Sequence, residues 1–185
     1  MNDKLPEHAH TKPLEIWFQD EARIGQQGTL TRRWAKRGTR PTAPRDQRYT
    51  WCYLFGAACP ARGVGAALVM PYADTDAHNK HLAEISKNVA LGAHAIVIED
   101  GAGYHTAHAV KVPDNITIVK LPPYTPELNS AENIWQWIRQ NKLSNRVYET
   151  YNDLVDAACD AWNDFTADPN VVTSVTTRQW AHVNS

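Results

Sequence analysis

The sequence predicts a single α/β domain built on a mixed β-sheet, and three observations lead to this prediction. The 185 residues are enough for one well-buried domain and too few for two comfortable ones. The hydrophobic content of 43%, with seven Trp and seven Tyr, is typical of a packed core. Along the chain, short apolar segments of strand length alternate with segments whose apolar residues recur at helical spacing.

Three strands are predicted in the first half of the chain, after a polar leader over residues 1–12 that we expect to be flexible. Residues 14–21 read LEIWFQDE, and their alternation places the apolar side chains and Asp20 on one face. Residues 49–58 and 63–71 are apolar and rich in aromatic or branched side chains. The proline and glycine between these two segments predict a hairpin.

A helix and two further strands are predicted next. Thr75 is the expected N-cap of the helix, and Gly92 is its expected end. Residues 95–100 read AIVIED, a nearly all-apolar strand of the kind that is buried on both faces, and Asp100 closes it. Another strand over residues 116–121 is stopped by the two prolines that follow it.

Two helices complete the prediction. One begins at about Ser130 and carries apolar residues at helical spacing. The other spans residues 151–165, with Thr150 as its expected cap. The pattern after Asp168 favours no one structure. We therefore assign residues 13–185 to one domain.

Several classes of protein are excluded by composition. The chain has no apolar run of about 18 residues and no apolar signal segment, so we expect a cytoplasmic protein, associated with the nucleoid if the source is bacterial. Its cysteines, Cys52, Cys59 and Cys159, are odd in number and widely spaced. This spacing favours reduced, mostly buried thiols over disulfides or a zinc site.

Basic residues are concentrated in one segment, although the net charge of the chain is only −1. Residues 23–48 contain eight basic side chains and one acid, so this segment carries +7 and the other 159 residues carry −8. A basic arm on an acidic body is suited to phosphate contact, and a solvated hairpin with scattered arginines is the alternative. The side chains that we expect to contact phosphates are Arg23, Arg32, Arg33, Lys36, Arg37 and Arg40.

Three carboxylates are the candidate metal ligands, although each also has a structural interpretation. Asp20 and Asp100 come at the ends of apolar strands, where an ionised carboxylate must be paired, hydrogen-bonded or metal-bound. Capping of a following turn is the alternative for both. Glu132 lies three residues after Asn129 at a helix start, a spacing that on its own favours a capping box.

Taken together, two strand-end aspartates and a helical glutamate predict a site for a pair of divalent ions. Mg²⁺ prefers carboxylate oxygens, and two ions about 4 Å apart activate a nucleophile and stabilise the leaving oxygen of a phosphodiester. The neighbouring acids Glu21, Glu99 and Glu127 are alternative ligands. Glu21 and Glu99 have the opposite strand parity and rank lower.

The chain resembles the DDE transposases of the mariner-like superfamily, particularly their bacterial insertion-sequence branch, in three motifs that occur in the family's order. WFQDEARIGQQG with WAKRG resembles the first motif and aligns its aspartate with Asp20. IVIEDGAGYH resembles the second and aligns the family's Asp and His with Asp100 and His105. LPPYTPELNSAENIW, the most specific segment, resembles the third and aligns its glutamate with Glu132. The family often has Asn and Pro where this chain has Gly101 and Ser130.

The resemblance implies a ribonuclease H-like fold, a five-stranded mixed sheet flanked by helices with Asp20 and Asp100 on adjacent central strands. It implies DNA cleavage and strand transfer with two Mg²⁺ or Mn²⁺ ions held by these aspartates and Glu132, and a homodimer assembled on DNA. The family's N-terminal helix-turn-helix region has no counterpart here. We therefore expect a fragment of a longer protein or the second reading frame of a split element.

Other interpretations stay open at the level of sequence. His105 is a candidate DNA contact, a support for Asp100, or a structural histidine. A different ribonuclease H-like nuclease, such as a junction resolvase, shares the acidic site, but the third motif argues against it. A regulatory fragment that dimerises or occupies DNA without cutting is the non-enzymatic alternative.

Overall fold

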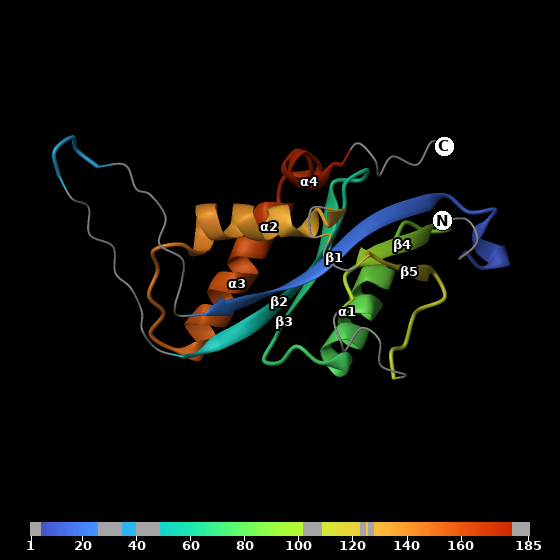
Figure 1. Ribbon diagram of the computed structural model, residues 1–185, viewed down its shortest axis with the longest axis horizontal. Helices are drawn as coiled ribbons and strands as arrows, with labels where there is room; N and C mark the ends of the chain where they lie inside the picture. The colour runs from blue at the N-terminus through green and yellow to red at the C-terminus, as the bar shows by residue number, and fades with distance from the viewer. Residues whose placement is uncertain are drawn as a thin grey trace.

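The computed structural model of the chain is organised around one five-stranded mixed sheet with the strand order β3-β2-β1-β4-β5 (Figure 1). The structure describes residues 5–25, 35–39, 49–101, 109–122, 125 and 128–178. β1 is central, pairing antiparallel with β2 on one side and parallel with β4 on the other. The strands are β1 (Leu14–Gly25), β2 (Trp51–Cys59), β3 (Val64–Met70), β4 (His94–Glu99) and β5 (Ile116–Lys120).

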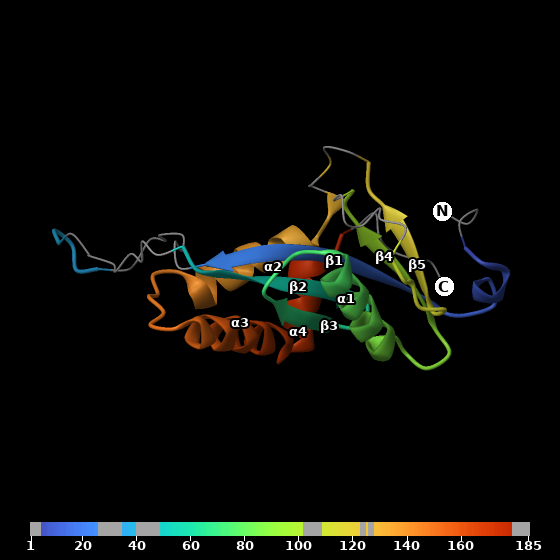
Figure 2. The ribbon, with the colours of Figure 1, turned by 90° about the horizontal axis from the view of Figure 1, so that it is seen from below.

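Helices cover both faces of this sheet. On one face, helices α2, α3 and α4 enclose the larger core cluster, which contains Ile16 and Phe18 of β1. On the other face, α1 encloses a second cluster around Trp17. Figures 1 and 2 show α2 and α3 grouped together and α1 apart from them. The helices are α1 (Thr75–Asn88), α2 (Ala131–Ile138) with a π-helical turn (Arg139–Leu143), α3 (Tyr151–Thr166) and α4 (Pro169–Thr176), and a 3-10 turn (Glu7–Ala9) precedes β1.

The predicted fold class is confirmed, and so are the hairpin, the adjacency of the two central strands and the capping of α3. Thr150 accepts a hydrogen bond from the backbone N–H of Asp153, and the Asp153 carboxylate accepts one in return from the N–H of Thr150. The cysteines are free, as expected, and Cys52 and Cys59 are buried. The segment after Asp168, for which the sequence favoured no one structure, forms α4.

Three local predictions were wrong. Asp20 does not close β1, because the strand continues to Gly25 through its pairing with β2. The N-cap of α1 is Asp74, whose carboxylate accepts from the N–H of Ala77, and Thr75 is the first helical residue. Gly92 does not end α1 either, since the helix stops at Asn88 and Gly92 has a φ of 80° in the turn that follows.

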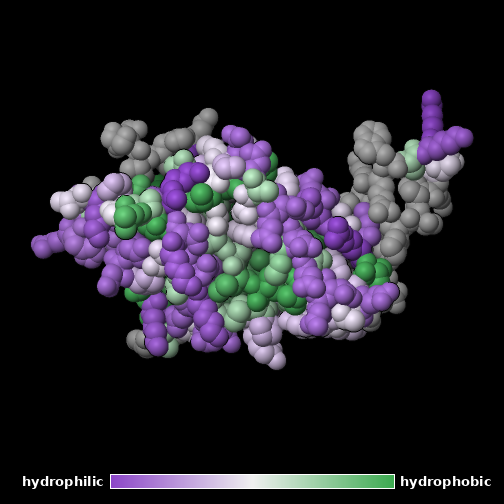
Figure 3. All heavy atoms as spheres, turned by 180° about the vertical axis from the view of Figure 1, so that it is seen from behind, coloured by the Kyte–Doolittle hydropathy of each residue, from purple (hydrophilic) through white to green (hydrophobic). Residues whose placement is uncertain are grey.

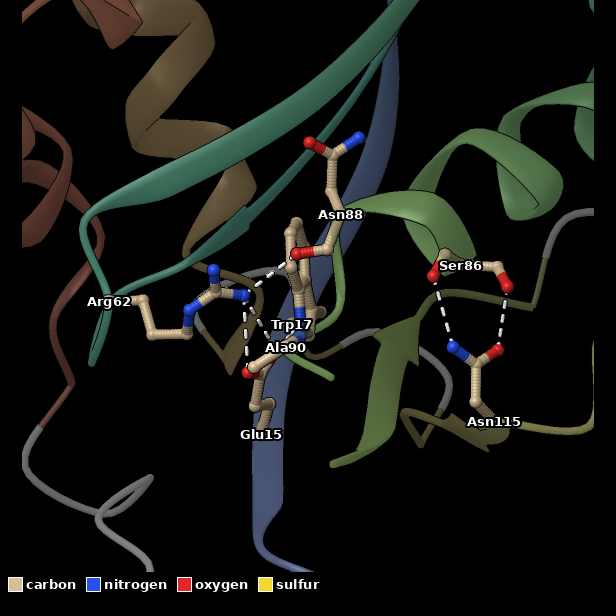
Figure 4. A network of polar contacts seen from close by, with 7 residues as sticks. All are labelled: Glu15, Trp17, Arg62, Ser86, Asn88, Ala90 and Asn115. Atoms are coloured by element: carbon tan, nitrogen blue, oxygen red, sulfur yellow. Dashed lines mark hydrogen bonds and ion pairs between the residues drawn. The ribbon is translucent and has the colours of Figure 1, made fainter. Parts of the chain in front are cut away.

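Glu15, at the start of β1, shows how this fold accommodates a buried carboxylate. It is 7% exposed, and it accepts hydrogen bonds from the Trp17 indole at 2.9 Å, the Ala90 backbone N–H at 3.1 Å and the Arg62 guanidinium at 3.2 Å (Figure 4). Arg62 also donates to the carbonyl of Asn88 at the end of α1. Glu15 is therefore a structural carboxylate that joins β1 to the end of α1 and the β2–β3 turn.

The surface is mixed in polarity. Figure 3, the view from behind Figure 1, shows an apolar patch near the centre of that face with polar side chains around it. None of the helices in the described residues is long and apolar enough to cross a membrane.

Candidate functional site

The register of β1 against its neighbours places Asp20 and Asp100 at the same edge of the sheet. The parallel pairing of β1 with β4 ends at Phe18 and Ile98, and each aspartate lies two residues beyond that last pair. Phe18 and Ile98 both belong to the core cluster under α2 and α3. Because side chains alternate along a strand, Asp20 has the same parity as Phe18 and faces α2. β1 continues past this point with β2 alone, and Asp20 pairs with Gly56 there.

Helix α2 carries Glu132 in its first turn, so the third carboxylate comes from the layer that covers Asp20. One turn later, the indole N–H of Trp135 donates to Oδ2 of Asp20 at 2.8 Å. Asn129, just before the helix, is 4% exposed and donates from its side-chain amide to the carbonyl of Gln19 at 2.8 Å. Both contacts attach the start of α2 to β1 beside Asp20.

Glu132 does not form the capping box that its spacing suggested. The N-cap of α2 is Ser130, which makes no side-chain capping hydrogen bond. The backbone N–H of Ala131 donates instead to Oδ1 of the Asn129 side chain at 3.1 Å. The structural interpretation that competed with metal binding by Glu132 is therefore removed.

The electrostatics of Asp20 reflect this environment. Burial raises the pKa of Asp20 from 3.8 to about 6, and the Trp135 hydrogen bond opposes that rise. The nearby charges of Glu132 and Asp100 add to the rise in pKa. Asp20 is therefore repelled by both of the other predicted ligands, and a divalent cation would neutralise such repulsion.

The alternative acids Glu21 and Glu99 lie close by with the opposite strand parity, Glu21 partly buried and Glu99 fully buried. Burial is the largest cause of the raised pKa of both carboxyls, each to about 8. Glu99 is 0% exposed, and its carboxylate lies 3.4 Å from Nε2 of His78, a fully buried side chain of α1. Glu99 is thus directed toward α1, while Asp20 is directed toward α2. Glu127, the third alternative, lies outside the described residues.

The carboxylates supply the oxygen donors that Mg²⁺ or Mn²⁺ requires. In the described part of the chain, no group of three or more His, Cys, Asp or Glu side chains is gathered closely enough to enclose a metal ion. The residue types and their placement at one sheet edge fit the predicted ions.

Three of the seven predicted DNA contacts lie in described segments. Arg23 extends from β1 with its guanidinium 5.1 Å from the ring centre of Trp51, a cation–π contact. Lys36 and Arg37 are exposed in the segment between β1 and β2. The remaining predicted contacts lie outside the described residues: Arg32, Arg33, Arg40 and His105.

Sequence reasoning missed the part that Trp135 plays at the site. Helical spacing assigned it to the core, and the ring is indeed only 2% exposed. Its position three residues after Glu132 places the two side chains on neighbouring parts of one helix face. A buried indole N–H also requires an acceptor, which was a usable signal, but only the tertiary structure identifies that acceptor as Asp20.

Comparison with known proteins assigns the family. The profile of the DDE superfamily endonuclease family matches residues 15–155. The chain is also 52% identical over 132 residues to the Uncharacterized protein y4pE/y4sA of Sinorhizobium fredii, a match that covers 71% of this chain and 98% of that protein.

Solved structures with the same fold include two complexes of Mos1 transposase. One is described as the Mos1 transposase paired-end complex with left transposon end, with a TM-score of 0.65 and 15% identity. The other is the Mos1 mariner paired end complex with Mn, with a TM-score of 0.66 and 14% identity. Each match covers 88% of this chain and 51% of the Mos1 chain, so this chain spans about half the length of those proteins.

These structural matches confirm the ribonuclease H-like fold, and the profile extends from Glu15 in β1 to Val155 in α3, including all three candidate carboxylates. The chain therefore belongs to the DDE superfamily endonuclease family.

Proposed function

We propose that this chain is the catalytic domain of a DNA transposase, which cleaves DNA at transposon ends and joins the freed ends to target DNA. The observation that carries the proposal is the register of β1 against β4, which brings Asp20 and Asp100 to one sheet edge under the helix of Glu132. Family membership and the likeness in fold to Mos1 transposase complexes support it.

In this proposal, Asp20, Asp100 and Glu132 would together hold two divalent ions. The solved Mos1 complexes with Mn and with Mg support Mn²⁺ or Mg²⁺ as the ion. When bound, such ions activate the attacking oxygen and stabilise the charge on the leaving oxygen. The protein's own contribution is to hold the three carboxylates at fixed positions in a partly desolvated site.

Two successive reactions follow from this assignment. In the first, water attacks a phosphodiester at the transposon end, the bond to the 3′ oxygen breaks, and a free 3′-hydroxyl is left. In the second, that hydroxyl attacks a phosphodiester of target DNA, and a target 3′-hydroxyl leaves. DNA is thus both substrate and partner, and the basic segment of Arg23, Lys36 and Arg37 supplies phosphate contacts without sequence specificity. A homodimer on DNA is part of the proposal.

The test is Mn²⁺-dependent nicking of supercoiled DNA and strand joining on a duplex taken from the flanks of the gene. Asp100→Asn removes one ligand charge with almost no change in shape, and we expect nicking to fall by about 100-fold or more. Asp156→Asn, at an exposed position of α3, is the matched control and should nick DNA at the wild-type level.

Two outcomes contradict the proposal. Nicking by Asp100→Asn at the rate of the Asp156→Asn control would exclude Asp100 from the metal site. A folded wild-type chain that binds Mn²⁺ but neither nicks nor joins DNA, alone or fused to a DNA-binding region, would favour a regulatory fragment.

A further inference from the structure

We infer that Trp135 is a positioning residue, whose indole N–H sets the orientation of the Asp20 carboxylate and fixes the helix of Glu132 relative to β1. The inference rests on the proposed function, because it treats Asp20 and Glu132 as ligands of the same pair of ions. Its starting point is the 2.8 Å hydrogen bond from Nε1 of Trp135 to Oδ2 of Asp20.

This hydrogen bond leaves the rest of the carboxylate available to a cation. The indole N–H is a single neutral donor that has no lone pair for a metal. It occupies one position on Oδ2, and the backbone N–H of Glu21 also donates to this carboxylate, so about two of its roughly four lone-pair positions remain. Asp20 thereby loses freedom to rotate without losing its charge to a salt bridge. Glu15, at the other end of the same strand, is paired with the Arg62 guanidinium and is closed to such a role.

The Trp135 ring is itself held firmly in place. It is 2% exposed and lies 6.4 Å, centre to centre, from the ring of Trp162 on α3, at an interplanar angle of 42°. A second-layer side chain can orient a ligand only if packing fixes its own rotamer. The two packed indoles satisfy that condition.

The strand next to Asp20 is shaped to admit this ring. Gly56 of β2 pairs directly with Asp20. A Cβ atom at position 56 would lie 2.7 Å from Cη2 of Trp135 and 2.6 Å from Cζ3 of Trp162, which is closer than two non-bonded carbon atoms approach each other. Glycine at this position therefore provides the space through which Trp135 reaches Asp20.

Trp135 also connects two of the three ligands mechanically. Glu132 and Trp135 are separated by one turn of α2, so a hydrogen bond that holds Trp135 against β1 also limits how far Glu132 can move from Asp20. A tryptophan with a purely structural role would fill the core equally well with its N–H bonded to any carbonyl. The hydrogen bond of Trp135 to Asp20, a proposed ligand, is what distinguishes a positioning role.

The first test makes the same substitution at two buried tryptophans, each of which donates its indole N–H to a carboxylate. Trp135→Phe removes the N–H bonded to Asp20, whereas Trp17→Phe removes the N–H bonded to the structural carboxylate of Glu15, on the other face of the sheet. Mn²⁺ affinity, measured by electron paramagnetic resonance of free Mn²⁺, should weaken about 10-fold in Trp135→Phe and stay at the wild-type value in Trp17→Phe. Thermal unfolding should show a comparable loss of stability in both. Equal Mn²⁺ affinities in the two variants would overturn the inference.

A second measurement requires no variant of Trp135 to fold. In the wild-type chain, the NMR resonance of the Trp135 indole N–H should shift when Mg²⁺ is added, because its acceptor then shares its charge with the ion. An unmoved Trp135 resonance in a protein that binds Mg²⁺ would overturn the inference and leave the proposed function intact. Mg²⁺ or Mn²⁺ binding that is unchanged in Asp20→Asn would instead overturn both, since Asp20 would then be no ligand.

Discussion

At the scale of single residues, two carboxylates of β1, Glu15 and Asp20, lie in different electrostatic environments. Glu15 is surrounded by donors from Trp17, Ala90 and Arg62. Asp20, five positions along the same strand, has the Trp135 indole as a donor and the repelling charges of Glu132 and Asp100 nearby. The first arrangement stabilises the fold. The second leaves a repulsion between carboxylates that a bound cation would reduce.

This difference predicts how stability depends on pH in the absence of metal. The pKa of Asp20 is raised from 3.8 to about 6 in the folded chain, so between these values the folded state binds the proton that the unfolded state has lost. The free energy of unfolding therefore falls as the pH rises through this window, and the cost is complete above about pH 6.

Chemical denaturation of wild type and Asp20→Asn without metal, from pH 4 to pH 8, measures this effect. Asparagine keeps an oxygen acceptor for Trp135 and cannot ionise. The stability of wild type relative to Asp20→Asn should fall as the pH rises from about 4 to about 6. Added Mg²⁺ should stabilise wild type at pH 8 far more than at pH 5. A wild-type-to-variant difference that is independent of pH would contradict the environment described for Asp20.

At the scale of secondary-structure elements, the site depends on where α2 is attached. Asn129 joins the start of the helix to β1 through the carbonyl of Gln19 at 2.8 Å. Asn133, one turn later, joins the same helix to α4 through the carbonyl of Val175 at 2.9 Å. These two amides are a matched pair, since only the first is directed at the strand that carries Asp20.

Replacing each amide by alanine separates the two attachments. Asn133→Ala removes one hydrogen bond and should lower the free energy of unfolding by about 1–2 kcal/mol. Asn129→Ala should lower it further, because it also removes the acceptor of the Ala131 N–H. Only Asn129→Ala should also weaken Mn²⁺-dependent nicking, because it loosens Glu132 relative to Asp20. Urea denaturation and the nicking assay measure the two effects. Equal nicking by the two variants would show that the attachment to β1 does not support the site.

The sequence was informative about elements because their signals are local. Alternation along residues 14–21 and 95–100 predicted two central strands, and the parity that ranked Asp20 above Glu21 agrees with the two core clusters of the structure. The ends of the elements were harder to predict from the sequence. β1 continues to Gly25 because β2 pairs with it there, and the sequence of residues 22–25 does not show that a partner strand is present.

Contacts between distant segments account for what the sequence could not predict at the site. Trp135 meets Asp20 across 115 positions, and Asn129 meets Gln19 across 110. The glycine at position 56 had no evident purpose until the register placed it opposite Asp20. Each of these features is defined by a side chain that another element brings near, and periodicity within one segment carries no such information.

At the scale of the whole molecule, the sheet order places β1 and β4 at the centre, with helical layers on both faces. The candidate ligands come from three elements that are far apart in the chain, β1, the end of β4 and the start of α2. In the sequence, the basic residues 23–48 overlap the end of β1 and precede β2, so the proposed phosphate contacts and the candidate ligands are carried on one chain.

The central claim is that Asp20, Asp100 and Glu132 together hold the catalytic ions, and locating Mn²⁺ in crystals of the chain tests it most directly. Anomalous diffraction from crystals soaked in Mn²⁺ should show one or two peaks at the shared edge of β1 and β4. Asp20 should lie within coordination distance of the ion or ions, with Asp100 and Glu132 as the other protein ligands. Mn²⁺ held instead by Glu21 or Glu99, on the α1 side of the sheet, would contradict the account.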